Sequence, residues 1–282
     1  MNRWKHWLLH GVVPWLGVLV VWQLVALASD PQFFPGPYLT FKGAIELSED
    51  GSLFTYIGYS FARVLSGWLL GSLIAIPVGL VMGRFKFIRA ITDPILNFIR
   101  FIPALAFVTL FMLWFGIGEQ SKIILIMYGT IFTVIMNTMT GVLSIEEDKI
   151  RSARSMGASE WQILLHVIVP ATVPFIFTGV RIAMSMSYLA ILGAEMVAAN
   201  EGVGFLIWNA RLYFKTDWIF VGLFALGIMG FTTDRLLGFV GRRLLGRYGV
   251  VHSNAAGQRE RKSRRTAQAN TVTGGDTYGK VG

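Results

Sequence analysis

The chain has 282 residues, of which 54% are hydrophobic and 15% are charged, and its mean hydropathy is +0.58. A composition this apolar excludes a soluble domain of the same size and predicts a membrane protein. The sequence contains no cysteine, which excludes disulfides and cysteine-ligated metal sites. The net charge of +9 lies beside apolar runs and in a tail, so we attribute it to membrane topology and not to nucleic-acid binding.

The first apolar run covers residues 8–28 and follows the basic residues Arg3 and Lys5. Its length suits a helix that crosses the membrane, which takes roughly 20 residues. Ala26 and Ala28 also form the small-residue pattern of a cleaved signal peptide. We favour a retained membrane helix, because the run is long for a signal peptide and no soluble domain follows it.

Five further membrane spans are expected after this run. Residues 29–56 precede them and are expected to form an extended loop, since prolines interrupt the loop at its start. Residues 88–103 alternate apolar and polar side chains at helical spacing, so they lie at the interface or begin the third span. Gly67, Gly71 and Gly79 favour close helix packing in the second span. The five spans are predicted at about 60–82, 104–115, 123–143, 175–198 and 218–240.

A polar segment, 144–174, stands between the fourth and fifth spans. Ser144 with Glu147, and Ser159 with Gln162, carry the capping-box signature of a helix start. The spacing therefore predicts two short helices.

The turn between these helices is expected at Gly157, because a left-handed residue after a helix costs least without a Cβ. Pro170 and Pro174 are expected to close the second helix. This segment resembles the EAA loop of ABC-importer permeases, although Arg151 stands where that family usually has Glu. The matching positions are Arg151, Ser152, Ala153, Gly157, Val167, Val169 and Pro170.

Outside the loop the resemblance extends over most of residues 63–245, and it points to the nitrate/sulfonate/taurine/bicarbonate branch of these permeases. It implies an all-α membrane protein of the type I ABC importer permease fold, with about six transmembrane helices and a cytoplasmic EAA-type coupling helix. It also implies a homodimer, two cytoplasmic ATPase subunits and an extracytoplasmic solute-binding protein. The segments that carry it are FARVLSGWLLG, ITDPILNFIRFIPALAF, LWFGIGEQSKI, PATVPFIFTGVRIA, AEMVAANEGVGFLIWNAR and TDWIFVGLFALGIMGFTTDRLL.

ATP hydrolysis is expected from a partner and not from this chain, which we expect to be non-catalytic. The sequence has no G-x-x-x-x-G-K-[ST] phosphate loop, and its one Gly-Lys pair is followed by Val281. The coupling loop would transmit the motion of the ATPase to the spans, with a solvated loop without a partner as the alternative. The residues expected to couple are Gly157 at the turn, Ala158, Ser159, Glu160 and Trp161 on the docking surface, and Pro170 in the joint to the fifth span.

One face of the fifth span carries polar and large residues at intervals of three or four. Such a face should point into protein or a watery path, because lipid leaves polar groups unpaired. We therefore expect it to line the translocation pathway. In the alternative, Arg181 reaches the inner interface and Glu195 the outer one. The expected pathway residues are Arg181, Met184, Ser185, Tyr188, Leu192 and Glu195.

The distribution of Lys and Arg predicts the orientation. With the N-terminus inside, the cytoplasmic segments hold 19 of the 25 basic residues and the outer segments hold 5. Both termini and the coupling loop are therefore expected in the cytoplasm, in a multi-pass protein of the bacterial inner membrane. Residues 1–248 would form the permease domain, and 249–282 a disordered basic tail that cannot bury a core.

Other functions find less support. A secondary transporter would favour carboxylates at mid-membrane and internal repeats, and a membrane enzyme would need a nucleophile or metal cluster. The four histidines are scattered, so neither a metal site nor a cofactor is expected. Arg181 and the branch favour a small oxyanion such as a sulfonate, taurine, nitrate or bicarbonate, with an uncharged heterocycle as the alternative. The second permease copy could be identical or different.

Overall fold

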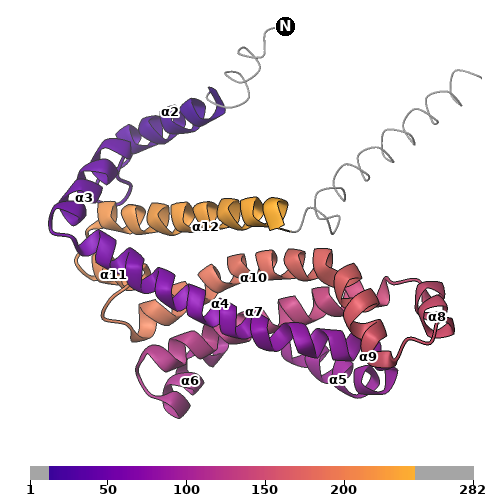
Figure 1. Cartoon of the computed structure of the whole chain (residues 1–282). Helices are drawn as coiled ribbons and strands as arrows, with labels where there is room; N and C mark the ends of the chain where they lie inside the picture. The colour runs from indigo at the N-terminus through magenta and orange to yellow at the C-terminus, as the bar shows by residue number, and fades with distance from the viewer. Residues whose placement is uncertain (1–12, 245–282) are drawn as a thin grey trace, which may run out of the picture.

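The computed structural model describes residues 13–244, which are predominantly helical and include no strand. Figure 1 shows three long helices, α4, α7 and α10, forming the body of the molecule, with α12 beside them and the short α8 and α9 at one end. The helices are α2 (Val13–Ala28), α3 (Pro37–Glu49), α4 (Ser52–Arg84), α5 (Lys86–Ile99), η2 (Ala104–Phe107), α6 (Val108–Phe115), α7 (Glu119–Leu143), α8 (Glu147–Ser155), α9 (Glu160–Ile163), η3 (Leu164–Ile168), α10 (Val169–Ala198), α11 (Val203–Leu212) and α12 (Thr216–Leu244).

A ridge of glycines on α4 lets α7 approach closely. A Cβ added at Gly71 would lie 2.8 Å from the Cβ of Thr130, and one added at Gly83 would lie 2.5 Å from the Cβ of Val142. Because lipid tails are as apolar as Leu, helices in a membrane gain affinity from such close van der Waals contact. The predicted close packing is confirmed, and the ridge consists of Gly67, Gly71, Gly79 and Gly83, with Ala75 in register between them.

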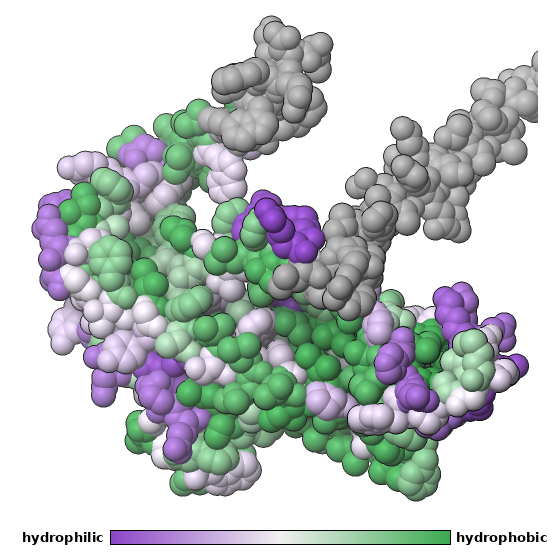
Figure 2. All heavy atoms as spheres, viewed as in Figure 1, coloured by the Kyte–Doolittle hydropathy of each residue, from purple (hydrophilic) through white to green (hydrophobic). Residues whose placement is uncertain are grey.

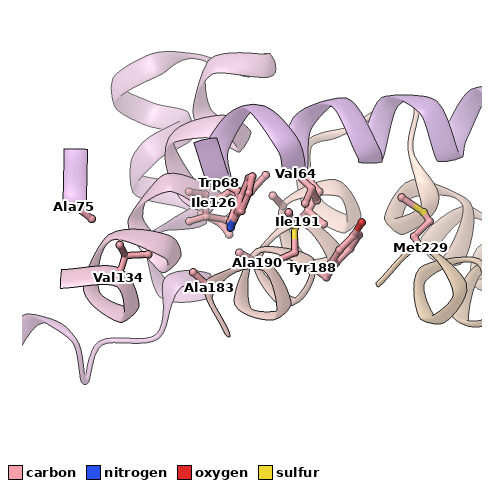
Figure 3. Close-up of a cluster of buried hydrophobic side chains, with 14 of the residues drawn as sticks. Val64, Trp68, Ala75, Ile126, Val134, Ala183, Tyr188, Ala190, Ile191 and Met229 are labelled. Atoms are coloured by element: carbon pink, nitrogen blue, oxygen red, sulfur yellow. The ribbon is translucent and has the colours of Figure 1, made fainter. Parts of the chain in front are cut away.

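The core lies where α4, α7 and α10 meet. Figure 3 shows Val64 and Trp68 of α4 beside Ile126 of α7 and Ile191 of α10, all of which are buried. The indole Nε1 of Trp68 donates to the Val180 carbonyl at 2.8 Å, so its one polar atom is satisfied inside the apolar core.

Four described helices are long and apolar enough to cross a membrane: α4, α7, α12 and a continuous helical stretch, Glu160–Val197. The pair α5 and η2–α6 passes the same test together but is bent by 83°, so it is a broken span or a re-entrant loop. This bend lies at the end of 88–103, the segment in which polar and apolar side chains alternate. The apolar helix α2 has 16 described residues and points away from the body (Figure 1). Figure 2 shows hydrophobic side chains over the middle of the visible face and hydrophilic ones around α8 and near α3, as expected for a membrane protein.

The extended loop expected over 29–56 is wrong, because residues 37–49 form α3. Pro37 occupies the first turn of this helix, where its missing N–H is not needed, and it starts the helix where we expected a break. Asp50 then accepts a hydrogen bond from the Ser52 backbone N–H at 2.8 Å at the start of α4. Hydrogen bonding from the side chain and backbone of Ser52 lowers the pKa of the Asp50 carboxyl.

Two predictions for the polar segment 144–174 are also wrong. Ser144 caps no helix start, because α7 continues to Leu143 and the Ser144 hydroxyl donates back to the Gly141 carbonyl at 2.7 Å. Pro170 and Pro174 do not close a helix: Pro170 lies in the first turn of α10 and Pro174 lies inside it. Pro170 follows the π-helical turn η3 inside the continuous helical stretch, Glu160–Val197, so the helix passes both prolines without ending. The predicted tail, 249–282, lies outside the described residues.

Candidate functional site

The coupling loop is a compact finger built from α8, a tight turn and α9. Gly157 has φ +83°, a left-handed conformation that side-chain-bearing residues rarely adopt, as its position predicted. The capping box at Ser159 is also confirmed: the Ser159 N–H donates to Gln162 Oε1 at 2.8 Å, and the Gln162 N–H donates to Ser159 Oγ at 3.3 Å. Both signals are local, which is why the sequence predicted them.

A small hydrophobic cluster fixes the finger to the long helices. Ala153 of α8 and Ile163 of α9 are buried with Val142 of α7 and Ile168 of η3, and Ala158 packs against them. This cluster packs the finger against α7 and against η3, which leads into α10. Ala158 therefore serves the interior of the finger more than its docking surface.

Glu160 ties the finger to α4. Its carboxylate accepts from Arg154 Nε at 3.1 Å and pairs with Arg84, the last residue of α4. The apolar side chains that the finger leaves free are Met156 and Trp161, which are 80% and 67% exposed. These two residues are exposed apolar positions on an otherwise charged finger, and Glu160 links helices within the chain. Arg151, at the position where the EAA pattern has Glu, pairs on the surface with Glu147 at 2.9 Å.

At the opposite end of the long helices, an ionic cluster joins α4, α7, α10 and α11. Arg63 of α4 is 4% exposed, and its Nη1 donates to Glu195 Oε1 at 2.7 Å while its Nη2 donates to Glu119 Oε1 at 2.7 Å. Lys122 approaches Glu119 at 3.0 Å. Ser60 donates to Glu195 Oε2 at 2.7 Å. Each buried charge thus has an opposite charge in contact, as burial requires.

The start of α11 completes this cluster. The Gly204 N–H donates to Glu195 Oε2 at 2.9 Å, and the Val203 N–H donates to Ser60 Oγ at 2.8 Å. Gly202 has φ +125°, and a Cβ there would lie 2.4 Å from the Glu195 carboxyl carbon. The turn between α10 and α11 therefore fits around Glu195 only with glycine at this position.

The structure divides the expected pathway face of α10. Arg181 Nη2 donates to Asp234 of α12 at 2.6 Å, so a carboxylate already neutralises this guanidinium. Met184 and Tyr188 are buried, with the Tyr188 hydroxyl 2.9 Å from that of Thr233. Ser185 is exposed, Leu192 is half-buried, and Glu195 belongs to the ionic cluster. Arg181 and Ser185 remain on the surface of the protomer, whereas the other members of the face pack inside it.

Sequence reasoning missed the partners in these contacts. Arg63 was counted with the outer loops, yet it lies in α4 and pairs with a residue 132 positions away. The signal that could have found it is a pair of opposite charges inside apolar helices, since membrane-buried charges are found paired.

Family comparison identifies the kind of protein. Residues 67–246 match the profile of the family described as the binding-protein-dependent transport system inner membrane component. The chain belongs to this family. It is therefore an ABC importer permease, as the EAA-like loop predicted.

Relatives of this permease include proteins named for oxyanion transport. It is 39% identical to a probable ABC transporter permease protein of Brucella melitensis over 79% of this chain and 90% of the relative. It is 34% identical to the taurine transport system permease protein TauC of Escherichia coli over 83% of this chain and 88% of the relative. It is 32% identical to the nitrate import permease protein NrtB of Synechococcus elongatus over 79% and 85%.

A solved structure confirms the architecture of the permease. A chain of the inward-facing MetNI methionine ABC transporter matches with a TM-score of 0.53, covering 66% of this chain and 94% of that chain at 19% identity. The permease thus has the type I importer fold.

Proposed function

We propose that two copies of this permease form the translocation pathway of an ATP-driven importer for a small oxyanion. Two cytoplasmic ATPase subunits would supply the energy, and an extracytoplasmic solute-binding protein would deliver the anion. Both termini would lie in the cytoplasm with α8 and α9. The relationship to permeases named for taurine and nitrate supports this substrate class.

The observation that carries the proposal is the rigid finger with an apolar tip. A partner that grips Trp161 and Met156 displaces α8 and α9 as one body, because the cluster around Ile163 joins them to α7 and α10. Pro170 stands at the first turn of α10, directly behind the finger. Exposed aromatic and Met side chains are typical anchors of protein interfaces. On the membrane side, Arg181 and Ser185 are the members of the expected pathway face that stay accessible on the protomer.

Replacing Gly157 tests the coupling role. Gly157→Val should abolish uptake while the protein still inserts, because a β-branched residue is strained at φ +83° and the finger would change shape. Gly157→Asn is the matched control, since Asn tolerates the left-handed region, and it should retain most of the uptake. The measurement is the uptake of labelled nitrate, taurine, alkanesulfonates and bicarbonate by cells in which the native gene of this permease has been deleted and replaced by each variant.

The same panel tests the substrate class. Loss of uptake of one anion in the deleted cells, restored by the wild-type gene, identifies the substrate. Normal uptake by Gly157→Val would contradict the coupling role, and unchanged uptake of every anion in the deleted cells would contradict the oxyanion.

A further inference from the structure

A cavity of about 490 Å³ lies at the break between α5 and η2–α6, where residues 100–105 face α7 and α10. Its wall includes Tyr128, Thr133 and Met136 of α7 and Met186 of α10. Tyr128 and Met136 lie on either side of the midpoint of α7, and Met186 lies close to the midpoint of α10. The cavity is therefore at mid-depth of the membrane-crossing helices.

A tyrosine of α7 contacts the break between α5 and η2. The Tyr128 hydroxyl lies 3.0 Å from the Ile99 carbonyl oxygen and 3.2 Å from that of Ile102, so α7 contacts the backbone where the helix is interrupted. Irregular backbone at membrane depth is tolerated where it is buried in protein or lines a cavity. This arrangement leaves Arg100, between the two carbonyls, free for another contact.

Arg100 is the charged residue of the cavity wall. Within residues 13–244 no carboxylate lies within 4.0 Å of it, whereas Arg63 and Arg181 are both paired with carboxylates. Its guanidinium carbon lies 5.1 Å from the centre of the Phe101 ring, which orients the side chain without neutralising it. The Arg100 side chain is exposed on the protomer and lines the cavity, and ionisable residues within membrane-crossing segments mark ion and substrate pathways.

The rest of the wall indicates which anion fits. The Thr133 carbonyl accepts from Asn137, and in the described part of the chain its hydroxyl has no hydrogen-bond partner. The guanidinium fork matches two oxygens of a planar or tetrahedral oxyanion, and the hydroxyl can donate to a third. Met136, Met186 and Leu189 make the remaining wall apolar. An oxyanion head with a short alkyl chain, as in an aliphatic sulfonate, matches both parts.

We propose that this cavity is a membrane subsite for the transported anion, in which Arg100 binds the oxyanion head and the Met-lined wall takes an alkyl chain. This inference rests on the proposed function. It assigns the anion contact to Arg100 and not to Arg181, because the Asp234 carboxylate already pairs with the Arg181 guanidinium.

The test is the maximal uptake rate of taurine, butanesulfonate and nitrate by cells that carry the complete importer. Arg100→Gln should lower uptake of all three at least tenfold, since a hydrogen-bonded charge contributes that much to binding an anion. Arg89→Gln is the matched control, because Arg89 lies on the adjoining helix α5, has no carboxylate within 4.0 Å among residues 13–244 and does not line the cavity. Basal ATP hydrolysis by the purified importer shows whether each variant still assembles.

A second variant probes the shape of the cavity and leaves the charge in place. A Cβ at Gly129 would have its nearest neighbours at 3.9 Å, so Gly129→Ala should fold normally and narrow the cavity. It should lower butanesulfonate uptake relative to nitrate uptake by a factor of about three or more, a change in selectivity that a purely structural role would not produce.

These outcomes separate the subsite from the importer. Wild-type uptake by Arg100→Gln, or equal losses in Arg100→Gln and Arg89→Gln, would overturn the subsite and leave the proposed function intact. If Arg100→Gln does not assemble, the Gly129→Ala selectivity decides, and an unchanged ratio would overturn the subsite. Absence of uptake of taurine, alkanesulfonates, nitrate and bicarbonate by the wild-type importer would overturn both proposals.

Discussion

At the scale of single residues, Glu195 is a buried carboxylate held by several partners. It is 1% exposed and accepts hydrogen bonds from Arg63, Ser60 and the Gly204 backbone, and Gly202 leaves it the space it needs. A buried charge with this many partners gives little net stabilisation as a set, but removing one member leaves the others uncompensated.

Glu195→Gln should therefore destabilise the permease strongly. The variant keeps the shape of the side chain and removes the charge that faces Arg63, at a cost of about 3–5 kcal/mol. Its melting temperature in detergent should fall by roughly 10 °C, at about 2–4 °C per kcal/mol for a chain of this size. Glu147→Gln is the control, because the Glu147 side chain is 68% exposed and pairs with Arg151 on the surface, where water can compensate its loss. Equal shifts for the two variants would contradict a buried, coupled role for Glu195.

At the scale of elements, the close packing of α4 on α7 depends on positions of α4 that carry no side chain or only a methyl group. Along one face of α4, every fourth position from 67 to 83 is Gly or Ala, and the partner atoms of α7 fill the space that a Cβ would take. Spacing of this kind is visible in sequence, which is why the contact could be predicted. The sequence did not predict α3 or the broken span, since Pro37 and residues 88–103 each permit more than one structure until the neighbouring helices are in place.

Gly71→Ala should push α4 and α7 apart. The added Cβ would lie 2.8 Å from the Thr130 Cβ, and overpacking of this kind costs about 1–3 kcal/mol. The melting temperature should fall by roughly 5 °C. Gly58→Ala lies on the same helix with no atom within 4 Å of the new Cβ, so its melting temperature should change by less than about 2 °C. A similar shift in both variants would show that the loss comes from helix backbone effects and not from the interface.

At the scale of the whole molecule, the sequence predicted four of the crossing helices, the finger and the family, because apolar length and local capping do not depend on distant residues. It did not predict how the ends of those helices are joined. The link from Arg84 to Glu160 spans 76 positions and that from Arg63 to Glu195 spans 132, and no local pattern encodes either. Of the six crossings expected, the described residues provide four to five.

The orientation of the whole molecule can be measured directly, because the absence of cysteine gives a clean background for single-cysteine labelling. Met156→Cys in the finger should react with a membrane-impermeant thiol reagent only from the cytoplasmic side, and Tyr38→Cys in α3 only from the opposite side. Both positions are well exposed, at 80% and 73%. Labelling of both positions from the same side of the membrane would contradict the proposed topology.

The continuous helical stretch, Glu160–Val197, gives the permease a lever arm. Its 38 residues correspond to about 57 Å at 1.5 Å per residue, with Trp161 near one end and Glu195 near the other. Pivoting the near end by about 5° would displace the far end by about 5 Å, which exceeds the reach of a hydrogen bond. Under the proposed coupling, a small stroke at the finger would therefore be sufficient to exchange the partners of Glu195 across the membrane.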